Sequence, residues 1–414
     1  MHNNILFVGH FFPRHLLKTV QTDSKGRMGM SNHNFEMSII KGLSKQDINL
    51  FCLSIPGVYS FPNNNTRFFI KSESYNENNI NVTSIGFCNM FIINKVWMIV
   101  AAVIAILREL NKFTGKDVDI IVNPPSFVLL FSCVIAKVFS RKKTSFNIIV
   151  PDLPFIITKM DRRTGIKGAI LKLLNSLTMN MIRLSESLVV LTKEMMDVIV
   201  RPKNFIVMEG LIDVENIDKQ QDHKLSLYNG KEIILYTGTL RRIFGVLNLL
   251  KAFSLLKNPE VELWICGEGD CENDIRDAAL FDPRIKFYGL VDSATALELQ
   301  SKATILVNPR TSEGEYTKYS FPSKTIEYLY AGKSVVINRL PGIPEDYYEY
   351  VYLPKDESVE ALADVLNSII NSNFSDRINK AYNGRNFIIH NKNSIYQTLR
   401  ILNLINSTKE SSIK

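Results

Sequence analysis

The chain has 414 residues, of which 46% are hydrophobic, with 49 Lys and Arg against 41 Asp and Glu. This composition is typical of a folded globular protein and excludes a disordered chain, collagen and a coiled coil. A single core rarely extends over so long a chain, so we expect two domains of roughly 200 residues each. The five cysteines are scattered without metal-ligand spacing, as expected of idle thiols in a reducing compartment.

The N-terminal residues MHNNILFVGHFF contain a strand-like run but lack the basic and small-residue regions of a signal peptide. The longest apolar stretch, 96–107, would cover only about 18 Å as a helix, whereas the apolar core of a bilayer is about 30 Å thick. We therefore expect a cytoplasmic protein without a membrane-spanning segment.

Positive charge is concentrated in the first half of the chain. Residues 1–200 carry 23 Lys and Arg against 13 Asp and Glu, whereas residues 201–414 carry 26 against 28. This asymmetry indicates an anionic partner, for which nucleic acid, an anionic lipid surface and phosphorylated substrates are the candidates, unless the lysines are merely solvated. Nucleic acid is not expected, because basic stripes of duplex length with interleaved aromatic residues are absent.

In chain order, the first half alternates short apolar runs with longer helical patterns, which predicts a parallel sheet with crossover helices. The Asn-rich stretch 61–81 is interpreted as a loop. The predicted strands are 5–9, 48–54, 81–87, 119–125, 145–151 and 187–192, with helices near 32–45, 92–113, 126–139 and 165–185.

The proline at position 202 predicts a hinge at 201–203, after which the alternation begins again. Two doubly wound α/β domains are therefore expected, at 1–201 and 202–385, and the helical tail 386–414 is expected to pack back on the first domain. The predicted strands of the second domain are 204–209, 232–238, 261–269, 285–289, 304–309 and 334–338.

In parallel α/β sheets, ligands bind beyond the carboxyl ends of the strands. In the second half, the loops at that edge are 238–245, 267–270, 289–292 and 308–332. Three of them open with glycine, and the fourth contains several charged side chains, which suits a nucleotide with phosphate groups. Neither the GxGxxG nor the GxxxxGK[ST] fingerprint is present, so dinucleotide and P-loop sites are disfavoured.

The fourth loop carries the most specific pattern. Its sequence YSFPSKTIEYLYAGKSVVIN resembles the segment of the retaining GT-B glycosyltransferases of family four in which two glutamates bracket seven residues. The resemblance extends to ILYTGTLRRIFGVLNLLKAFSLL and LWICGEGD. The sequence SFPSK within the loop is similar to the corresponding sequence of bacterial surface-polysaccharide transferases. It implies a GT-B fold, in which two Rossmann-like domains face each other across a cleft.

By this resemblance, Glu327 is the second glutamate and accepts hydrogen bonds from the ribose hydroxyls of the nucleotide, a role that two carboxylate oxygens suit. The alternative is an exposed helix residue, although its apolar neighbours indicate burial. The first glutamate falls at Tyr319, which cannot bind two sugar hydroxyls as a carboxylate does. The donor sugar is therefore expected to be held by backbone N–H groups of Ser320 to Lys324, or by Glu313 or Glu315.

The two phosphate-binding cations of the family, an Arg and a Lys, fall at Thr239 and Phe244. The diphosphate charge is therefore expected to be neutralised by other cations and by the dipole of the helix after Gly245. One candidate cation is Arg242, for which a solvated surface charge is an equal alternative. The replacement cations are expected among Arg241, Arg242, Arg310 and Lys324, and the predicted donor site comprises Gly238, Thr239, Arg241, Gly267, Glu268, Arg310, Glu313, Tyr319, Ser320, Phe321, Pro322, Ser323, Lys324 and Glu327.

In the first half, His10 and Asp152 follow strands whose loops would face the cleft. Either side chain suits the orientation of an acceptor hydroxyl, although Asp152 equally fits a helix cap and His10 a packed side chain. The predicted catalytic groups are Asp152, His10, Arg242 and Lys324, and the acceptor side comprises Gly29, Asn123 and Asp152.

Asp117-Val118-Asp119 matches the metal-binding DxD motif of a different glycosyltransferase fold. It precedes a buried strand at the end opposite the ligand loops, so it is interpreted as a solvated turn. No His/Cys/Asp cluster indicates zinc, and neither a metal nor another cofactor is predicted.

The helical pattern at 165–185 is amphipathic. Such a helix either lies on an anionic membrane or packs on the sheet of its own domain. We predict that its apolar stripe packs on the sheet, as most amphipathic helices do, and that the surrounding cations attach the protein to an anionic membrane. The stripe comprises Ile166, Ile170, Leu173, Leu174, Leu177 and Met181, and the cations are Lys159, Arg162, Arg163, Lys167, Lys172 and Arg183.

Together these features predict a retaining, metal-independent hexosyltransferase with a UDP- or GDP-linked sugar as donor. The expected acceptor is a lipid-diphosphate-linked saccharide at the inner face of the cytoplasmic membrane, in O-antigen, capsule or exopolysaccharide biosynthesis. Two alternatives remain open: a GT-B nucleotide-sugar epimerase, which would need no acceptor, and a non-catalytic nucleotide-sugar-binding module, which the missing Glu and Lys motivate.

Overall fold

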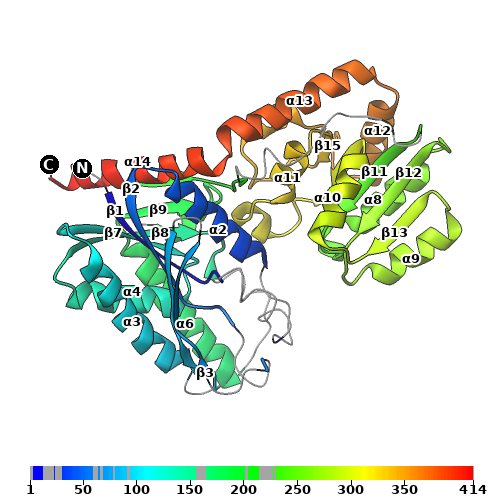
Figure 1. The fold of residues 1–414 in the computed structure, drawn as a ribbon. Helices are drawn as coiled ribbons and strands as arrows, with labels where there is room; N and C mark the ends of the chain where they lie inside the picture. Colours follow the sequence, from blue (N-terminus) through cyan, green and yellow to red (C-terminus); the bar gives the residue numbers. More distant parts are fainter. Residues whose placement is uncertain are drawn as a thin grey trace. The chain divides into compact units, whose positions relative to one another are not determined.

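The chain forms two compact α/β units in the computed structural model (Figure 1). Unit 1 comprises Met1–Asp213 and Ser394–Lys414, and unit 2 comprises Val214–Asn393. The structure describes residues 3–12, 23, 30–58, 64–65, 69–77, 80–90, 94–154, 165–200, 204–213, 227 and 230–413.

Unit 1 is built on an eight-stranded sheet in the order β10-β9-β8-β7-β1-β2-β5-β4. All neighbouring strands are parallel except β4 and β5. The central strands are apolar on both faces, as parallel strands covered by helices on both sides must be. The strands are β1 (Asn3–Gly9), β2 (Ile48–Ser54), β4 (Glu73–Glu77), β5 (Ile80–Ser84), β7 (Asp117–Asn123), β8 (Lys143–Val150), β9 (Ser187–Val190) and β10 (Phe205–Val207), with β3 (Phe69–Ile70) and β6 (Phe87–Cys88) forming a separate antiparallel pair.

Helices cover both faces of this sheet (Figure 1). On one face lie α3 (Asn94–Lys112), α4 (Phe127–Phe139) and α6 (Gly165–Arg183), and α4 contacts both of its neighbours. On the other face, α2 (Met30–Ser44) contacts the C-terminal helix α14 (Ser394–Ile413), which also contacts β9 and β10. Right-handed crossovers impose this division, because the chain moves in opposite directions from β1 to β2 and from β7 to β9.

The aspartate pair, which the sequence predicted as a solvated turn, lies within β7 (Asp117–Asn123); Asp117 is exposed as expected, but Asp119 is not. Asp119 lies within β7 and is only 1% exposed. Its carboxylate accepts hydrogen bonds from Lys409 Nζ of α14 at 2.7 Å and from Ser145 Oγ at 2.6 Å. The strand therefore begins earlier than expected, and Asp119 ties the C-terminal helix to the sheet of unit 1.

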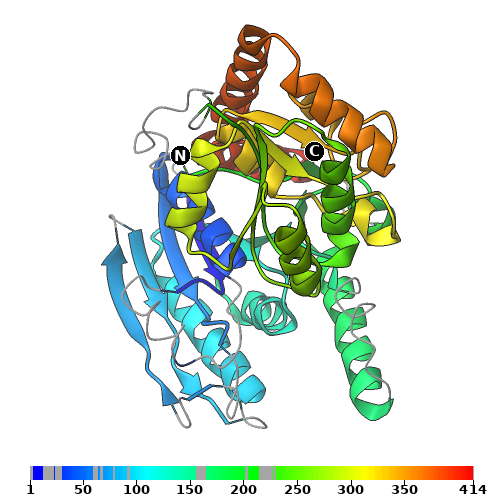
Figure 2. The ribbon, with the colours of Figure 1, turned by 90° about the vertical axis from the view of Figure 1, so that its right-hand side faces the viewer.

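Unit 2 is built on a five-stranded parallel sheet in the order β13-β12-β11-β14-β15. In Figure 2, α10 and α13 lie on one side of this sheet and α8 and α12 on the other, where α8 contacts α12; α11 contacts α13. The strands are β11 (Glu232–Thr237), β12 (Val261–Cys266), β13 (Ile285–Gly289), β14 (Ile305–Asn308) and β15 (Ser334–Ile337), and the helices are α8 (Val246–Leu255), α9 (Glu272–Phe281), α10 (Ser293–Lys302), α11 (Lys324–Tyr330), α12 (Val359–Ile370) and α13 (Phe374–Asn391).

Two predicted elements differ from the structure. The strand expected at 204–209 to open the second domain is β10, which pairs in parallel with β9 and so completes the sheet of unit 1. The stretch 61–81, expected as a loop, contains β4, whose polar sequence ESYNE is atypical of strands but pairs antiparallel with β5. The units divide after Asp213 and after Asn393, and the hinge expected at 201–203 lies outside the described residues.

The apolar stripe of α6 was predicted to face the sheet, and for most of its length it does not. Ile166, Ile170, Leu173 and Leu177 are exposed, whereas Met181, near the end of the helix, is buried. The remaining buried residues of α6, such as Gly168 and Ile182, lie on the opposite side of the helix. In the described part of the chain, no helix is both long and apolar enough to cross a membrane.

A buried ion pair fixes α13 to the sheet of unit 2. Arg377 is 1% exposed and donates from Nη1 and Nη2 to the two carboxylate oxygens of Glu232, at 2.5 and 2.9 Å. Removing one partner of a buried pair leaves an uncompensated charge, which costs about 3–5 kcal/mol. We expect Arg377→Met to lower the free energy of unfolding by that amount in urea denaturation.

The control is Arg339→Met, which removes a bidentate but solvent-exposed pair with Glu345. Exposed pairs contribute about 0–1 kcal/mol, so this variant should unfold almost as the parent does. Equal losses in the two variants would contradict the role of the Arg377–Glu232 pair.

Candidate active site

The loops at the carboxyl edge of the unit 2 sheet pack directly against one another. A Cβ atom on Gly267 would lie 1.8 Å from the carbonyl oxygen of Gly238, and one on Gly245 would lie 2.0 Å from that of Pro309. Both glycines also have positive φ angles, 140° and 75°, which favour glycine. Leu240 N donates to the carbonyl of Glu268 at 2.9 Å. The fold thus brings together loops 238–245, 267–270 and 308–332, as the sequence predicted.

Glu327 is held at this edge by its neighbour in α11. The buried Tyr328 hydroxyl accepts a hydrogen bond from Thr237 N at 2.9 Å and lies 3.1 Å from Thr237 O, so it fixes α11 to the end of β11. The Glu327 carboxylate accepts hydrogen bonds from Lys324 Nζ at 2.8 and 2.9 Å and from Gln300 Nε2 at 2.5 Å. Its side chain is 36% exposed, less buried than its apolar neighbours indicated, because those neighbours take the buried positions of α11.

Gln300 was not found by sequence reasoning. It is 1% exposed on α10, and its Oε1 atom has no hydrogen-bond partner. Nothing in the local pattern of α10 distinguishes this residue from an ordinary helix position, so only its contact with Glu327 in the folded chain reveals it.

Arg310 is a buried cation at the start of the loop after β14. Its side chain is 8% exposed, its Nη2 donates to Ser320 Oγ at 2.6 Å, and its Nε has no partner. The guanidinium carbon lies 4.8 Å from the ring centre of Tyr316 and 5.8 Å from that of Phe244. Among the described residues no carboxylate pairs with Arg310. Burial lowers the pKa of this guanidinium, but an arginine stays charged at neutral pH.

The other predicted phosphate-binding cations have different surroundings. The Arg241 guanidinium carbon lies 6.0 Å from the ring centre of Phe244, the same ring that lies near Arg310. Arg242 is exposed and donates from Nη2 to Asp274 at 2.8 Å, and Lys324 pairs with Glu327. Of these four cations, Arg310 and Arg241 have no carboxylate partner among the described residues, and both guanidinium groups lie near the ring of Phe244.

The remaining donor-loop residues mainly shape the loop. Ser320 accepts a hydrogen bond from Arg310 and donates one to the carbonyl of Tyr316 at 3.1 Å.

The next two residues of the loop pack against the rest of unit 2. Phe321 is buried against Tyr347 with ring centres 5.3 Å apart, and the Pro322 carbonyl accepts a hydrogen bond from Thr325 N at 2.8 Å. Tyr319 is half-buried, whereas Thr239, Glu313 and Ser323 are exposed.

In unit 1, His10 follows β1 and is held by two neighbours. Its Nδ1 lies 2.7 Å from the carbonyl of Ile55, and its Nε2 lies 2.8 Å from Ser126 Oγ. Because a carbonyl can only accept, Nδ1 carries the proton and the Ser126 hydroxyl donates to Nε2. Ser126, which sequence reasoning missed, is also the N-cap of α4.

Two buried side chains beside His10 have unsatisfied oxygens. Glu36 of α2 is fully buried, accepts from His10 N at 2.8 Å and leaves Oε1 without a partner; burial raises its pKa well above the usual range. Asn123, which ends β7, is 1% exposed and leaves Oδ1 without a partner. The sequence predicted Asn123 here but did not identify Glu36, since a glutamate in an amphipathic helix is normally exposed.

Asp152 follows β8, at the same edge as His10 and Asn123, and is exposed. Partial removal from water raises its pKa to about 6. Gly29, predicted on the acceptor side, and the cations Lys159, Arg162 and Arg163 lie outside the described residues.

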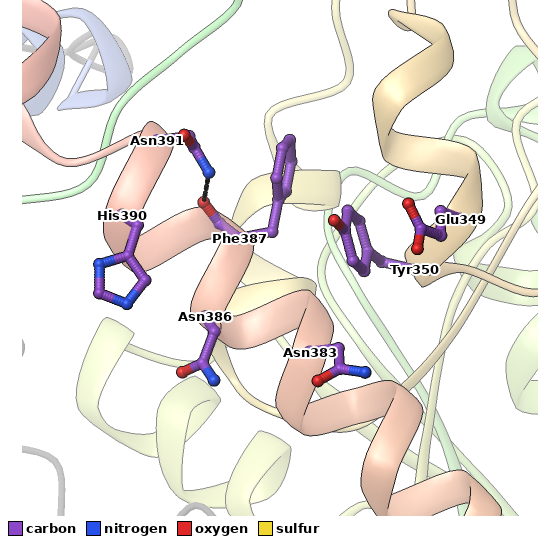
Figure 3. Close-up of a pocket in the computed structure, with 7 residues that line it drawn as sticks. All are labelled: Glu349, Tyr350, Asn383, Asn386, Phe387, His390 and Asn391. Atoms are coloured by element: carbon purple, nitrogen blue, oxygen red, sulfur yellow. Dashed lines mark hydrogen bonds between the residues drawn. The ribbon is translucent and has the colours of Figure 1, made fainter.

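A separate open pocket of about 290 Å³ lies on unit 2 between α13 and the turn at Glu345–Tyr350 (Figure 3). Amide side chains and the stacked rings of Tyr350 and Phe387, 4.7 Å apart, dominate its walls. None of the sequence-predicted site residues lines it. The described residues contain no group of three or more His, Cys, Asp or Glu arranged to hold a metal ion.

Comparison with known proteins finds a family match within unit 2. Residues 231–372 match the model of the family described as glycosyl transferases group 1. No curated protein matches the chain. Three similar solved structures each have a TM-score of 0.62 and are covered over 100% of their own length. Sucrose-phosphate synthase from Thermosynechococcus elongatus is 13% identical over 99% of this chain, and Anabaena HepE in complex with UDP is 12% identical over 98% of this chain. The α,α-trehalose 6-phosphate synthase from Burkholderia multivorans is 8% identical over 100% of this chain.

The fold is therefore that of the GT-B glycosyltransferases, which confirms the predicted fold class. The family match covers residues 231–372, which are 142 of the 414 residues. Together the fold and this match support a glycosyltransferase of the GT-B type.

The buried state of His10 predicts a pH-dependent stability. Burial lowers the pKa of His10 from 6.5 to about 4. Between these two values the unfolded chain binds a proton at His10 that the folded chain does not, so this residue lowers stability as the pH falls. We expect the stability of His10→Gln to decrease less than that of the parent between pH 7 and 4.5, measured by urea unfolding at several pH values.

An NMR titration of the His10 ring provides the direct control, with a midpoint near 4 as the expected result. A midpoint near 6.5, or the same pH dependence in the variant and the parent, would contradict a buried neutral His10.

Proposed function

We propose that this protein is a retaining glycosyltransferase that transfers a sugar from a nucleoside-diphosphate sugar to a saccharide acceptor. The observation that carries the proposal is the buried Arg310, a cation without a carboxylate partner in the described part of the chain, at the ligand-binding edge of a group 1 domain. A buried charge without a counter-ion is costly, so the site favours an anionic ligand.

In this proposal Arg310 and Arg241 bind the diphosphate of the donor. The aromatic faces of Tyr316 and Phe244 hold these guanidinium groups while leaving their N–H donors for phosphate oxygens. Glu327 binds the ribose hydroxyls, exchanging its contacts with Lys324 and Gln300 for the nucleotide. UDP is the first nucleotide to test, because the structurally similar HepE binds UDP, and GDP is the second.

During transfer the bond between the sugar C1 and the diphosphate oxygen breaks, and C1 forms a bond to the acceptor oxygen on the same face. Fixed cations stabilise the charge that develops on the leaving diphosphate, which then accepts the proton of the acceptor hydroxyl. The retention of configuration and the independence from metal ions follow from the resemblance to family four. His10 and Asp152 orient the acceptor hydroxyl in unit 1.

The proposed acceptor is a lipid-diphosphate-linked saccharide at the cytoplasmic face of the membrane, as in surface-polysaccharide assembly. The excess of Lys and Arg in residues 1–200 supports an anionic membrane partner. A second candidate is transfer to a soluble sugar phosphate, because the structural neighbours include sucrose-phosphate and trehalose-phosphate synthases.

The proposal is tested by incubating the protein with UDP- and GDP-sugars and each acceptor class. NMR of the product should show transfer to the lipid-linked acceptor with the anomeric configuration of the donor. Transfer to sugar phosphates alone would favour the second candidate. Turnover of the nucleotide sugar without an acceptor would indicate an epimerase, and binding without turnover a non-catalytic module.

Arg310→Ala should weaken the binding of UDP about 10- to 100-fold, because charged hydrogen bonds contribute about 1.5–3 kcal/mol. Uridine lacks the diphosphate, so the affinity for uridine should not change in this variant. Glu327→Ala, by contrast, should weaken UDP and uridine alike. Calorimetry with both ligands measures the difference.

Arg276→Ala is the matched control, because Arg276 is an exposed arginine paired with Glu272 on α9. It should bind UDP as the parent does. If Arg310→Ala bound UDP with unchanged affinity, the assignment of the diphosphate site would be wrong even if the protein transferred sugar.

A further inference from the structure

Two helices of unit 1 expose rows of large apolar side chains. The α3 stripe comprises Val96, Trp97, Val100 and Ile104, and the α6 stripe comprises Ile166, Ile170, Leu173 and Leu177. Val96 is 65% exposed, Trp97 49%, Ile166 80% and Leu173 60%. Side chains that recur at helical spacing normally face a core, so two exposed stripes on the helices that flank α4 require an explanation.

The inward side of each helix is already occupied. On α3 the buried residues include Met98, Ala102 and Ile106, which lie on a different side of the helix from the stripe. On α6 the stripe lies opposite Gly168 and Ile182. The exposed stripes are therefore additional to the packing of unit 1 and are not required by its core.

Both stripes lie at the same edge of unit 1. Helices α4 and α6 follow strands β7 and β8, so each begins at the carboxyl edge of the sheet. Helix α3 precedes β7 and runs toward its amino end, so the N-terminal half of α3 lies at the same carboxyl edge. Between them, α4 contacts both helices and exposes Phe131 near its own N-terminal half, stacked on Phe127 at 5.3 Å. The apolar surface thus borders the edge that carries His10, Asn123 and Asp152.

Cations flank the stripes. Lys167 and Lys172 are exposed on α6 and lie to either side of its stripe, about 100° and 120° around the helix from its first residue. Arg108 is exposed on α3 about 20° around the helix from Trp97, the residue that borders the stripe on that side. Apolar stripes with basic borders and a tryptophan are the pattern of helices that lie in the interface of an anionic bilayer.

We propose that the α3 and α6 stripes insert into the surface of an anionic phospholipid bilayer, with Arg108, Lys167 and Lys172 at the headgroups. Exposed apolar stripes with cations at their borders are complementary in charge and polarity to the surface of an anionic bilayer. The inference deepens the proposed function and rests on it for its purpose, since insertion there brings the carboxyl edge of unit 1 to lipid-linked acceptors.

Trp97 reports directly on insertion, because the chain has one other tryptophan, the buried Trp264 of unit 2. In the full-length Trp264→Phe variant, vesicles of equal parts phosphatidylglycerol and phosphatidylcholine should shift the Trp97 emission to shorter wavelength. Brominated acyl chains in the same vesicles should quench it. Unchanged emission with vesicles present would overturn the proposal.

The stripe itself is tested by Ile170→Glu with Leu173→Glu, which should weaken cosedimentation with these vesicles at least about tenfold. The matched control is Leu280→Glu with Phe281→Glu on α9, two apolar side chains that are 83% and 89% exposed in unit 2. The control should sediment with vesicles as the parent does, and circular dichroism should show both variants folded. Equal vesicle binding by the parent and the α6 variant would overturn the proposal.

Two further readouts separate the alternatives. If the stripes instead joined two copies of this chain, sedimentation velocity without lipid would show a dimer that the α6 variant dissociates, and the parent would not bind vesicles. The thermal shift with UDP should be the same in the α6 variant and the parent. Vesicle binding without any UDP binding would refute the proposed function and leave the membrane surface standing.

Discussion

Parallel strand pairing is the constraint on which both functional edges depend. In a parallel sheet every strand ends at the same edge, so the loops that follow β11, β12 and β14 must share one small region. That crowding requires glycine at Gly245 and Gly267, where a Cβ atom would collide with a neighbouring carbonyl. The same constraint in unit 1 places His10, Asn123 and Asp152 at one edge, although they are far apart in the sequence.

The chemistry of the unit 2 edge depends on how a cation is stabilised without a carboxylate. At the position where the resemblance to family four implies a phosphate-binding lysine, this chain has Phe244, whose ring lies near the guanidinium groups of Arg310 and Arg241. An aromatic face stabilises a cation without neutralising it. A carboxylate in that position would compete with the proposed diphosphate ligand, whereas an aromatic ring leaves the positive charge of the guanidinium groups available for it.

Unit 1 shows the reverse arrangement, in which burial disfavours the charged forms of ionisable groups. His10 donates to a backbone carbonyl and accepts from Ser126, and burial disfavours its charged form. The neighbouring Glu36 is buried in the same way, with its pKa raised. A neutral imidazole beside a hydroxyl can exchange hydrogen bonds with a saccharide without a net change in charge. The cations and apolar stripes of α3 and α6, by contrast, lie on the exposed surface of unit 1.

The sequence by itself determined the order of strands and helices, the two-unit α/β architecture and the loops that carry the unit 2 site, because periodicity and glycine placement are local signals. It did not determine which sheet 204–209 joins, since strand partners lie far away in the chain. Only the tertiary structure showed that Lys324 and Arg242 are paired, while the buried Arg310 has no carboxylate partner among the described residues. It alone decided that Gln300 and Glu36 are buried beside site residues and that the α6 stripe faces outward, because burial and ion pairing depend on which surfaces of distant segments meet.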